Sequence, residues 1–292
     1  MFYAIARKLM MNFTENFADA ENTEQISGES LTVEQAIANL RHEDLSLRYY
    51  AAWWIGRFRV REPKAIQALI DLLQEEGDRT DEGGFPLRRN AARALGKLGD
   101  LQAVPSLIQC LNCPDYYVRE AAAQALEMLG DSRAIAPLLQ LLAGGVTAAV
   151  QVEGKPHLTQ PYSAIIEALG TLNATEAIAQ IEPFMEHSVE RVKNSAARAM
   201  FQLTGERYYG DRLTDALDAE DLQLRRSALM DLGAIGYLPA AEAISETLAE
   251  NSLKLIALKG LLEHHLEVPD PEQPPSLDQD PIRVMNLMDS LL

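Results

Sequence analysis

An all-α solenoid of repeated helix pairs is the fold class that the sequence predicts. One segment of the 292-residue chain occurs in six copies that share a pattern of apolar and small residues. The copies are LRYYAAWWIGRFRV (47–60), LRRNAARALGKLGD (87–100), VREAAAQALEMLGD (118–131), PYSAIIEALGTLNA (161–174), VKNSAARAMFQLTG (192–205) and LRRSALMDLGAIGY (224–237). Their starts lie 40, 31, 43, 31 and 32 residues apart, and such a period is typical of stacked supersecondary units.

Each copy is predicted to form one helix. Apolar residues recur at helical spacing in the second copy, and its small residues permit a neighbouring helix to come close. These apolar residues are Leu87, Ala91, Ala94, Leu95 and Leu98. Gly99 follows as a helix breaker at a C-terminal position. In three copies an aspartate stands four residues before the arginine at the second position of the copy, and it is expected to be the N-cap of the helix. These aspartates are Asp44, Asp115 and Asp221.

A second apolar run follows the helix stop, as in AVPSLIQCL (103–111) and AIAPLLQLL (134–142). The early prolines Pro105 and Pro137 are tolerated near a helix start, where backbone amides have no intrahelical acceptor. Each repeat is therefore helix, turn, helix. This alternation is typical of HEAT-like repeats, in which neighbouring units bury a shared core. We expect about six helix pairs plus terminal capping helices.

The chain divides into four predicted parts. Residues 1–30 form a polar, flexible extension, and 31–266 form the solenoid, which LTVEQAIANL (31–40) caps at its start. Residues 267–281 are rich in Pro and acidic side chains and are predicted to be a linker. Residues 282–292 form a short amphipathic helix that docks on a partner or on the solenoid's own groove. Its predicted apolar stripe comprises Ile282, Met285, Met288 and Leu292.

Two insertions interrupt the repeat. The first inner helix is expected to end near Gly56, and its partner helix begins at Pro63. The first insertion, 75–86, is rich in Gly and Asp and is predicted to be a loop. The second, 143–161, is long and nonhelical, so it is either a plain surface loop or a loop that contacts a substrate.

Composition limits the possible partners. The formal net charge is −17 and no basic stripe is present, so we expect neither nucleic acid nor an anionic membrane to bind. The N-terminal MFYAIARKLMM lacks the features of a secretory signal, which predicts a cytoplasmic protein. Cys110 and Cys113 have no further ligands at zinc-site spacing, and we expect reduced structural thiols and no metal.

The first copy differs from the others in its aromatic residues. Trp53 and Tyr49 occupy positions that are charged or polar in most other copies, so they are predicted to form an exposed aromatic pair. Trp54 stands where most other copies have alanine. For Trp54 and Tyr50, packing at the end of the array and contact with a ligand remain equally open.

These segments carry a resemblance to a known family. YYAAWWIGRF, GGFPLRRNAARALGKLGD, YVREAAAQALEMLGD and ENSLKLIALKGLLEHH together resemble the alpha (E-type) subunit of the heterodimeric phycocyanobilin lyases of cyanobacteria. The similarity runs from about residue 31 to 266. It implies pairing with a homologous F-type subunit and attachment of phycocyanobilin, as substrate rather than cofactor, to a cysteine of the apo-phycocyanin alpha subunit. It also implies that the repeated helices line a concave groove.

Such chemistry requires aromatic walls for the tetrapyrrole, cations for its propionates and an acid near its pyrrole nitrogens, whereas the nucleophile comes from the substrate protein. The candidate bilin-binding residues are Tyr49, Tyr50, Trp53, Trp54, Arg57, Arg89, Arg93, Glu120, Glu167 and His157. The catalytic residues are unknown at this stage. One alternative is a noncatalytic scaffold that grips a partner helix in its groove. Another is a lyase that serves a related biliprotein or also isomerises the bilin.

Overall fold

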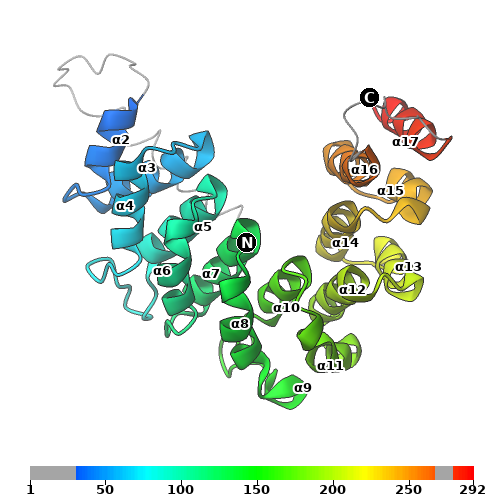
Figure 1. Cartoon of the computed structure of the whole chain (residues 1–292), viewed down its shortest axis with the longest axis horizontal. Coiled ribbons are helices and arrows are strands. Elements are labelled where there is room, and N and C mark those ends of the chain that lie inside the picture. Colours follow the sequence, from blue (N-terminus) through cyan, green and yellow to red (C-terminus); the bar gives the residue numbers. More distant parts are fainter. Residues whose placement is uncertain (1–30, 267–278) are drawn as a thin grey trace.

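The protein is a curved solenoid built from two rows of helices (Figure 1). The computed structural model describes residues 31–266 and 279–292, so the predicted extension (1–30) and most of the predicted linker (267–281) lie outside the described residues. The inner row, on the concave side, comprises α3 (Leu45–Phe58), α5 (Pro86–Leu98), α7 (Tyr116–Leu129), α10 (Tyr162–Thr171), α12 (Glu190–Thr204), α14 (Leu222–Ile235) and α16 (Asn251–Leu266). The outer row comprises α2 (Val33–Asn39), α4 (Pro63–Leu72), α6 (Val104–Cys110), α8 (Ile135–Leu142), α11 (Ile178–Ile181), α13 (Arg207–Asp215) and α15 (Ala241–Glu246). The predicted alternation of two helix types is confirmed.

The predicted ends of the inner helices are confirmed with one exception. The side chains of the three aspartate N-caps accept hydrogen bonds from backbone amides two residues downstream, at 2.7 to 2.8 Å. Gly99 takes the left-handed conformation after α5, with φ of 76°. The prediction that α3 ends near Gly56 is wrong, because α3 continues to Phe58 and Arg59 becomes the left-handed cap. Gly56 is a packing residue instead.

Glycine at this position lets successive inner helices pack backbone against side chain. A Cβ added to Gly56 would lie 2.9 Å from the Cα of Ala94, and one added to Gly96 would lie 2.9 Å from the Cα of Ala125. Gly170 meets Ala199 and Gly233 meets Ala257 in the same way. Real Cβ atoms do not approach so closely, so any larger residue would push the two helices apart.

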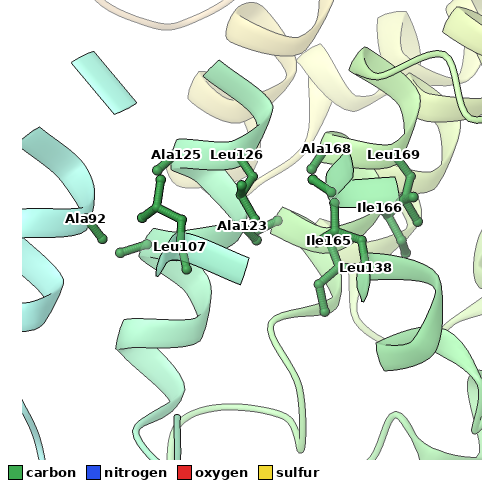
Figure 2. Packing of buried hydrophobic residues seen from close by; sticks show 14 of the residues in the cluster. Ala92, Leu107, Ala123, Ala125, Leu126, Leu138, Ile165, Ile166, Ala168 and Leu169 are labelled. Carbon is green, nitrogen blue, oxygen red and sulfur yellow. The ribbon is translucent and has the colours of Figure 1, made fainter. Parts of the chain in front are cut away.

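The core lies between the two rows. In Figure 2, Leu107 and Leu138 of the outer helices lie next to inner-row side chains such as Ala123 and Ile165, and all four are fully buried. Cys110 belongs to this core as a free thiol, and its burial raises its pKa to about 12. A thiol held in its neutral form among apolar side chains contributes packing rather than chemistry.

The two insertions lie on the same edge of the solenoid. The first is a loop, as predicted, up to the start of α5 at Pro86. The second was expected to be nonhelical, but it contains the short helix α9 (Gly145–Ala148) and a bridge between Gln151 and Leu158. Lys155 in this insertion lies 3.9 Å from Glu82 in the first.

Arg119 of α7 anchors the second insertion. Its guanidinium donates hydrogen bonds to the carbonyl of Thr159 at 3.0 Å and to the side chain of Gln160 at 2.9 Å. The buried imidazole of His187 is hydrogen-bonded to the carbonyl of Ala149 at 2.9 Å. Backbone groups of the insertion thus find partners in the solenoid, so the insertion is an ordered part of the fold.

The last described helix is α17 (Gln279–Ser290), which packs on α15 and α16 at the end of the array rather than in the groove. The predicted apolar stripe is wrong for Ile282 and Leu292, which are 42% and 92% exposed, whereas Met288 packs against the core and Met285 is partly buried. The buried residues of the helix are Pro281 and Val284. The helix begins at Gln279, three residues earlier than predicted. Contact with α15 and α16 determines which of its faces is buried. None of the helices in the described ranges is long and apolar enough to cross a membrane.

Replacing Gly96 by valine should lower the free energy of unfolding by about 1–3 kcal/mol, because the new side chain would overlap Ala125. Urea unfolding followed by far-UV circular dichroism measures this change. The control is Lys97→Val, which adds the same side chain at the next, exposed position of α5. Equal unfolding midpoints for the two variants would show that the close helix contact is not required.

Candidate functional site

A groove of about 380 Å³ opens on the concave side where α3, α5 and α7 lie next to one another. Its base is made of small residues, because the glycine and alanine positions of the inner helices bring no bulk into the groove. Larger side chains border it at successive repeat positions. These bordering residues are Trp53, Asn90, Arg93, Lys97, Gln124 and Met128.

Trp53 is the aromatic wall of the groove, and its side chain is 47% exposed. The ring of Tyr50, one turn earlier, stacks on it with centroids 5.7 Å apart and an interplanar angle of 29°. Tyr50 is itself 50% exposed. The tyrosine therefore braces the indole from the side, and both rings face solvent, as expected of a surface that binds an apolar ligand or partner.

The predicted pairing of Tyr49 with Trp53 is wrong. The Tyr49 hydroxyl donates a hydrogen bond to Asp78 of the first insertion at 3.1 Å, and burial together with the Asp78 charge raises the pKa of Tyr49 to about 12. Asp78 also accepts from the backbone amide of Leu87 at 2.6 Å. The insertion supplies a partner that comparison of the repeats could not reveal, and Tyr49 ties the insertion to the helices instead of lining the groove.

Trp54 and Arg57 also lie outside the lining of the groove. Trp54 is partly buried against the core, and its ring lies 4.8 Å from that of Phe58. The Arg57 guanidinium lies 5.9 Å from the centre of the Phe58 ring. Of the two residues whose role the sequence left open, Trp54 packs at the end of the array, whereas Tyr50 is on the open surface.

Two arginines and a carboxyl group gather beside the groove. Burial raises the pKa of Glu120, and the nearby charges of Arg89 and Arg93 oppose this effect without cancelling it. Burial also lowers the pKa of Arg93, with Arg89 adding to the decrease. The three predicted residues are thus brought together in a part-buried environment where a charged or hydrogen-bonding ligand would interact strongly.

His157 joins this cluster from the second insertion. Its ring stacks on Tyr116 with centroids 4.2 Å apart and an interplanar angle of 11°, and the ring of Tyr117 lies edge-on at 5.9 Å. Its Nδ1 lies 2.9 Å from the carbonyl oxygen of Leu158, which can only accept, so this nitrogen carries the proton. The Arg89 guanidinium lies over the Tyr117 ring at 5.0 Å. The second insertion therefore contributes to the site surface.

Glu167 does not serve as a groove acid, contrary to prediction. It is 6% exposed, and its carboxylate accepts hydrogen bonds from Arg191 and from the Ser195 hydroxyl, both at 2.6 Å. Burial raises its pKa, and the neighbouring arginine charges oppose the shift. Because its oxygens are already bound within the protein, Glu167 belongs to an internal network.

Arg198 of α12 is the centre of that network. Its guanidinium reaches Glu127 of α7 at 2.5 Å, Glu167 of α10 at 3.4 Å and Asp231 of α14 at 3.5 Å. Glu127 takes the place that glycine has in α5. Asp231 takes the place of the usual alanine. Two pairs of neighbouring inner helices, α7 with α10 and α12 with α14, lack the glycine–alanine contact, and the network takes its place there.

Several residues in or beside the groove were not predicted from the sequence. Lys97 lies in the groove. It has the same repeat position as Arg57, and this correspondence could have identified it from the sequence. Tyr116 and Tyr117 directly follow the N-cap Asp115, so the pair YY at a helix start could have been noticed. Asn90, Gln124 and Met128 carry no special signal, because such residues are common on helix surfaces. Among the described residues, no group of three His, Cys, Asp or Glu side chains could hold a metal ion.

The repeats match two family models. Residues 47–75, which include the aromatic segment, match the PBS lyase HEAT-like repeat, and residues 85–151 match HEAT repeats. The phycocyanobilin lyase subunit alpha of Nostoc sp. (strain PCC 7120) is 63% identical over 266 residues, which cover 91% of this chain and 96% of the relative. This chain belongs to the family of phycocyanobilin lyase alpha subunits.

Other members and a solved structure agree with this assignment. The phycocyanobilin lyase subunit alpha of Synechocystis sp. (strain PCC 6803) is 62% identical over 262 residues, covering 89% of this chain and 96% of the relative. In the solved complex of CpcE and CpcF of phycocyanin lyase from Nostoc sp. PCC7120, the matched chain has a TM-score of 0.84 at 61% identity, covering 94% of this chain and 100% of that chain. The bilin biosynthesis protein PecE of Mastigocladus laminosus is 46% identical over 238 residues, covering 81% and 83%.

Replacing Arg198 by methionine should lower the free energy of unfolding of this lyase subunit by about 3 kcal/mol, because the buried Glu167 and Asp231 and the part-buried Glu127 would lose a shared cation. Urea unfolding measures the change. The control is Arg133→Met, which removes the exposed ion pair with Asp131 and should leave the unfolding midpoint unchanged. A midpoint for Arg198→Met equal to that of the control would contradict a structural role for the network.

Proposed function

We propose that this chain is the alpha subunit of a heterodimeric lyase that attaches phycocyanobilin through a thioether to a cysteine of the phycocyanin alpha subunit. It acts in the cytoplasm with a homologous F-type subunit, and phycocyanobilin is its substrate. Membership of the lyase family supports this activity. The observation that carries the proposal for this chain is the groove in which an exposed Trp53 faces the cations Arg93 and Lys97.

The groove matches the chemistry of an open-chain tetrapyrrole. The flat conjugated rings would stack on Trp53, which Tyr50 holds in place, and the thioether side chain of Met128 offers a polarizable contact on the α7 side. The two propionates would pair with Arg93 and Lys97, since charge-assisted hydrogen bonds in a part-buried site are stronger than those in water. Ring stacking and charge pairing together fix the position and the orientation of the bilin.

Attachment adds a thiol across an exocyclic double bond of the bilin. The substrate cysteine's sulfur forms a bond to the exocyclic carbon, and the π bond breaks. The thiol gives up its proton, and the adjacent ring carbon gains one proton, so the addition needs no other reactant. Glu120 is suited to this proton transfer, because burial brings the pKa of its carboxyl closer to neutrality. When ionised, the same carboxylate can accept hydrogen bonds from pyrrole N–H groups, with Arg89 and Arg93 beside it.

Replacing Trp53 by alanine should reduce bilin transfer by the heterodimer at least tenfold, since the stacking wall is lost. Absorption of the phycocyanin product measures transfer, and the far-UV helical signal should not change, because the indole is exposed. The matched control is Tyr208→Ala, which removes an aromatic side chain 59% exposed on the outer helix α13. Unaltered transfer by Trp53→Ala would remove the groove from the mechanism. The wild-type chain should shift the absorption of free phycocyanobilin. An unchanged spectrum would favour the alternative function, a noncatalytic scaffold that binds partners but not bilin.

Esterifying both propionates tests the role of the cations. The wild-type heterodimer should bind the dimethyl ester of phycocyanobilin at least tenfold more weakly than the free acid, because the ester carries no negative charge for Arg93 and Lys97 to pair with. The Arg93→Ala/Lys97→Ala variant should bind both forms with similar affinity. Titration monitored by bilin absorption provides the dissociation constants. A variant that retained full preference for the free acid would place the propionates elsewhere.

A further inference from the structure

Each inner helix buries one face against the inner helix before it. In α5 this face includes Asn90, Ala94 and Leu98, and the close contact of Ala94 with Gly56 lies at its centre. Small or aliphatic residues fill the same three positions in the next helices. These residues are Ala121, Ala125 and Leu129 in α7, Ala164, Ala168 and Leu172 in α10, and Ser195, Ala199 and Leu203 in α12.

In α3 the corresponding three positions are aromatic. Tyr50, Trp54 and Phe58 form what we call the α3 end face, and no inner helix precedes α3 within the described residues. Tyr50 is 50% and Phe58 is 59% exposed, whereas Leu98 at the position of Phe58 is 1% exposed. Three large aromatic side chains at an open end of an array are an exposed apolar patch of the kind that another chain segment covers.

The spacing of the repeats identifies the segment that would lie there. In three repeats the outer helix begins five residues after the left-handed glycine that ends the inner helix before it, whereas α13 begins at Arg207, two residues after Gly205. The pairs are Gly99 and Val104, Gly130 and Ile135, and Gly236 and Ala241. The outer helix α2 begins at Val33, and Gly28 stands five residues before it. Gly28 thus stands at the same distance from an outer helix as the glycine that ends the inner helix in those three repeats.

The composition of that segment complements the α3 end face. Residues 13–28, FTENFADAENTEQISG, contain the large apolar residues Phe13, Phe17 and Ile26. The segment carries four acidic residues and no Lys or Arg. Arg57 and Arg59 are exposed at the C-terminal end of α3, beside Phe58. Apolar contact and opposite charge therefore favour the same pairing.

We propose that residues 13–28 of this chain bind to the α3 end face and cover Tyr50, Trp54 and Phe58. The large side chains of α3 supply most of the buried apolar area, which explains why the segment itself needs few apolar residues. Since Tyr50 stacks on Trp53, holding Tyr50 also holds the wall of the groove. This inference does not depend on the lyase activity and can be tested without bilin.

The test uses tryptophan fluorescence. The chain has two tryptophans, both in α3, so a Trp53→Phe background leaves Trp54 as the reporter of the end face. Acrylamide quenching is compared between the full chain and a chain shortened to residues 29–292. The shortened chain should show at least a twofold larger quenching constant and a red-shifted emission maximum, with an unchanged helical signal by circular dichroism.

Point variants separate docking from any other effect of shortening the chain. In the full-length chain, Phe13→Ser/Phe17→Ser should reproduce most of the increase in quenching, whereas the matched control Phe2→Ser should not change it. Equal quenching of the full and shortened chains would overturn the proposal. Protection of Trp54 that appears in both chains only after the F-type subunit is added would also overturn it and would assign the α3 end face to that subunit.

Discussion

The contact between a glycine of one inner helix and an alanine of the next determines most of this structure. At the four joints where it occurs in the described ranges, a Cβ on the glycine would come within 2.7 to 2.9 Å of the alanine Cα. This approach places successive inner helices close together in a fixed register. Side chains one turn away from the contact must then project onto the concave surface, as Trp53 and Arg93 do. The groove is a consequence of how its base is packed.

Two joints of the inner row lack this contact, and charges take its place. Glu127 stands at the glycine position of α7, Phe201 stands at that of α12, and Asp231 stands at the alanine position of α14. The resulting gaps are occupied by Arg191 and Arg198, which reach carboxylates on three helices. Opposite charges that are largely removed from water bind firmly only in good geometry, so the network restricts how these joints can bend. The charged side chains in the middle of the concave face are therefore paired with one another, and the open groove remains near α3.

The two tyrosines and two tryptophans of α3 have four different environments. Tyr49 is hydrogen-bonded to the first insertion, Tyr50 braces the indole, Trp53 borders the groove, and Trp54 packs at the end of the array. Consecutive residues on a helix point about 100° apart, so neighbours in sequence cannot share one face. One short motif thus connects an insertion, a groove and an array end. The aromatic residues of this motif therefore have several structural roles besides the proposed contact with the ligand.

The sequence by itself determined the repeated helix pairs, their N-caps and most of their ends, because these depend on residues within a few positions of one another. It also predicted that Trp53, Arg89, Arg93 and Glu120 share the concave side, since equivalent repeat positions lie on the same side of successive helices. Only the tertiary structure decided that Tyr49 bonds to Asp78 and that Glu167 is buried among arginines. Those partners lie 29 and 24 residues away along the chain, on other elements, and helical periodicity carries no information about which distant side chains meet.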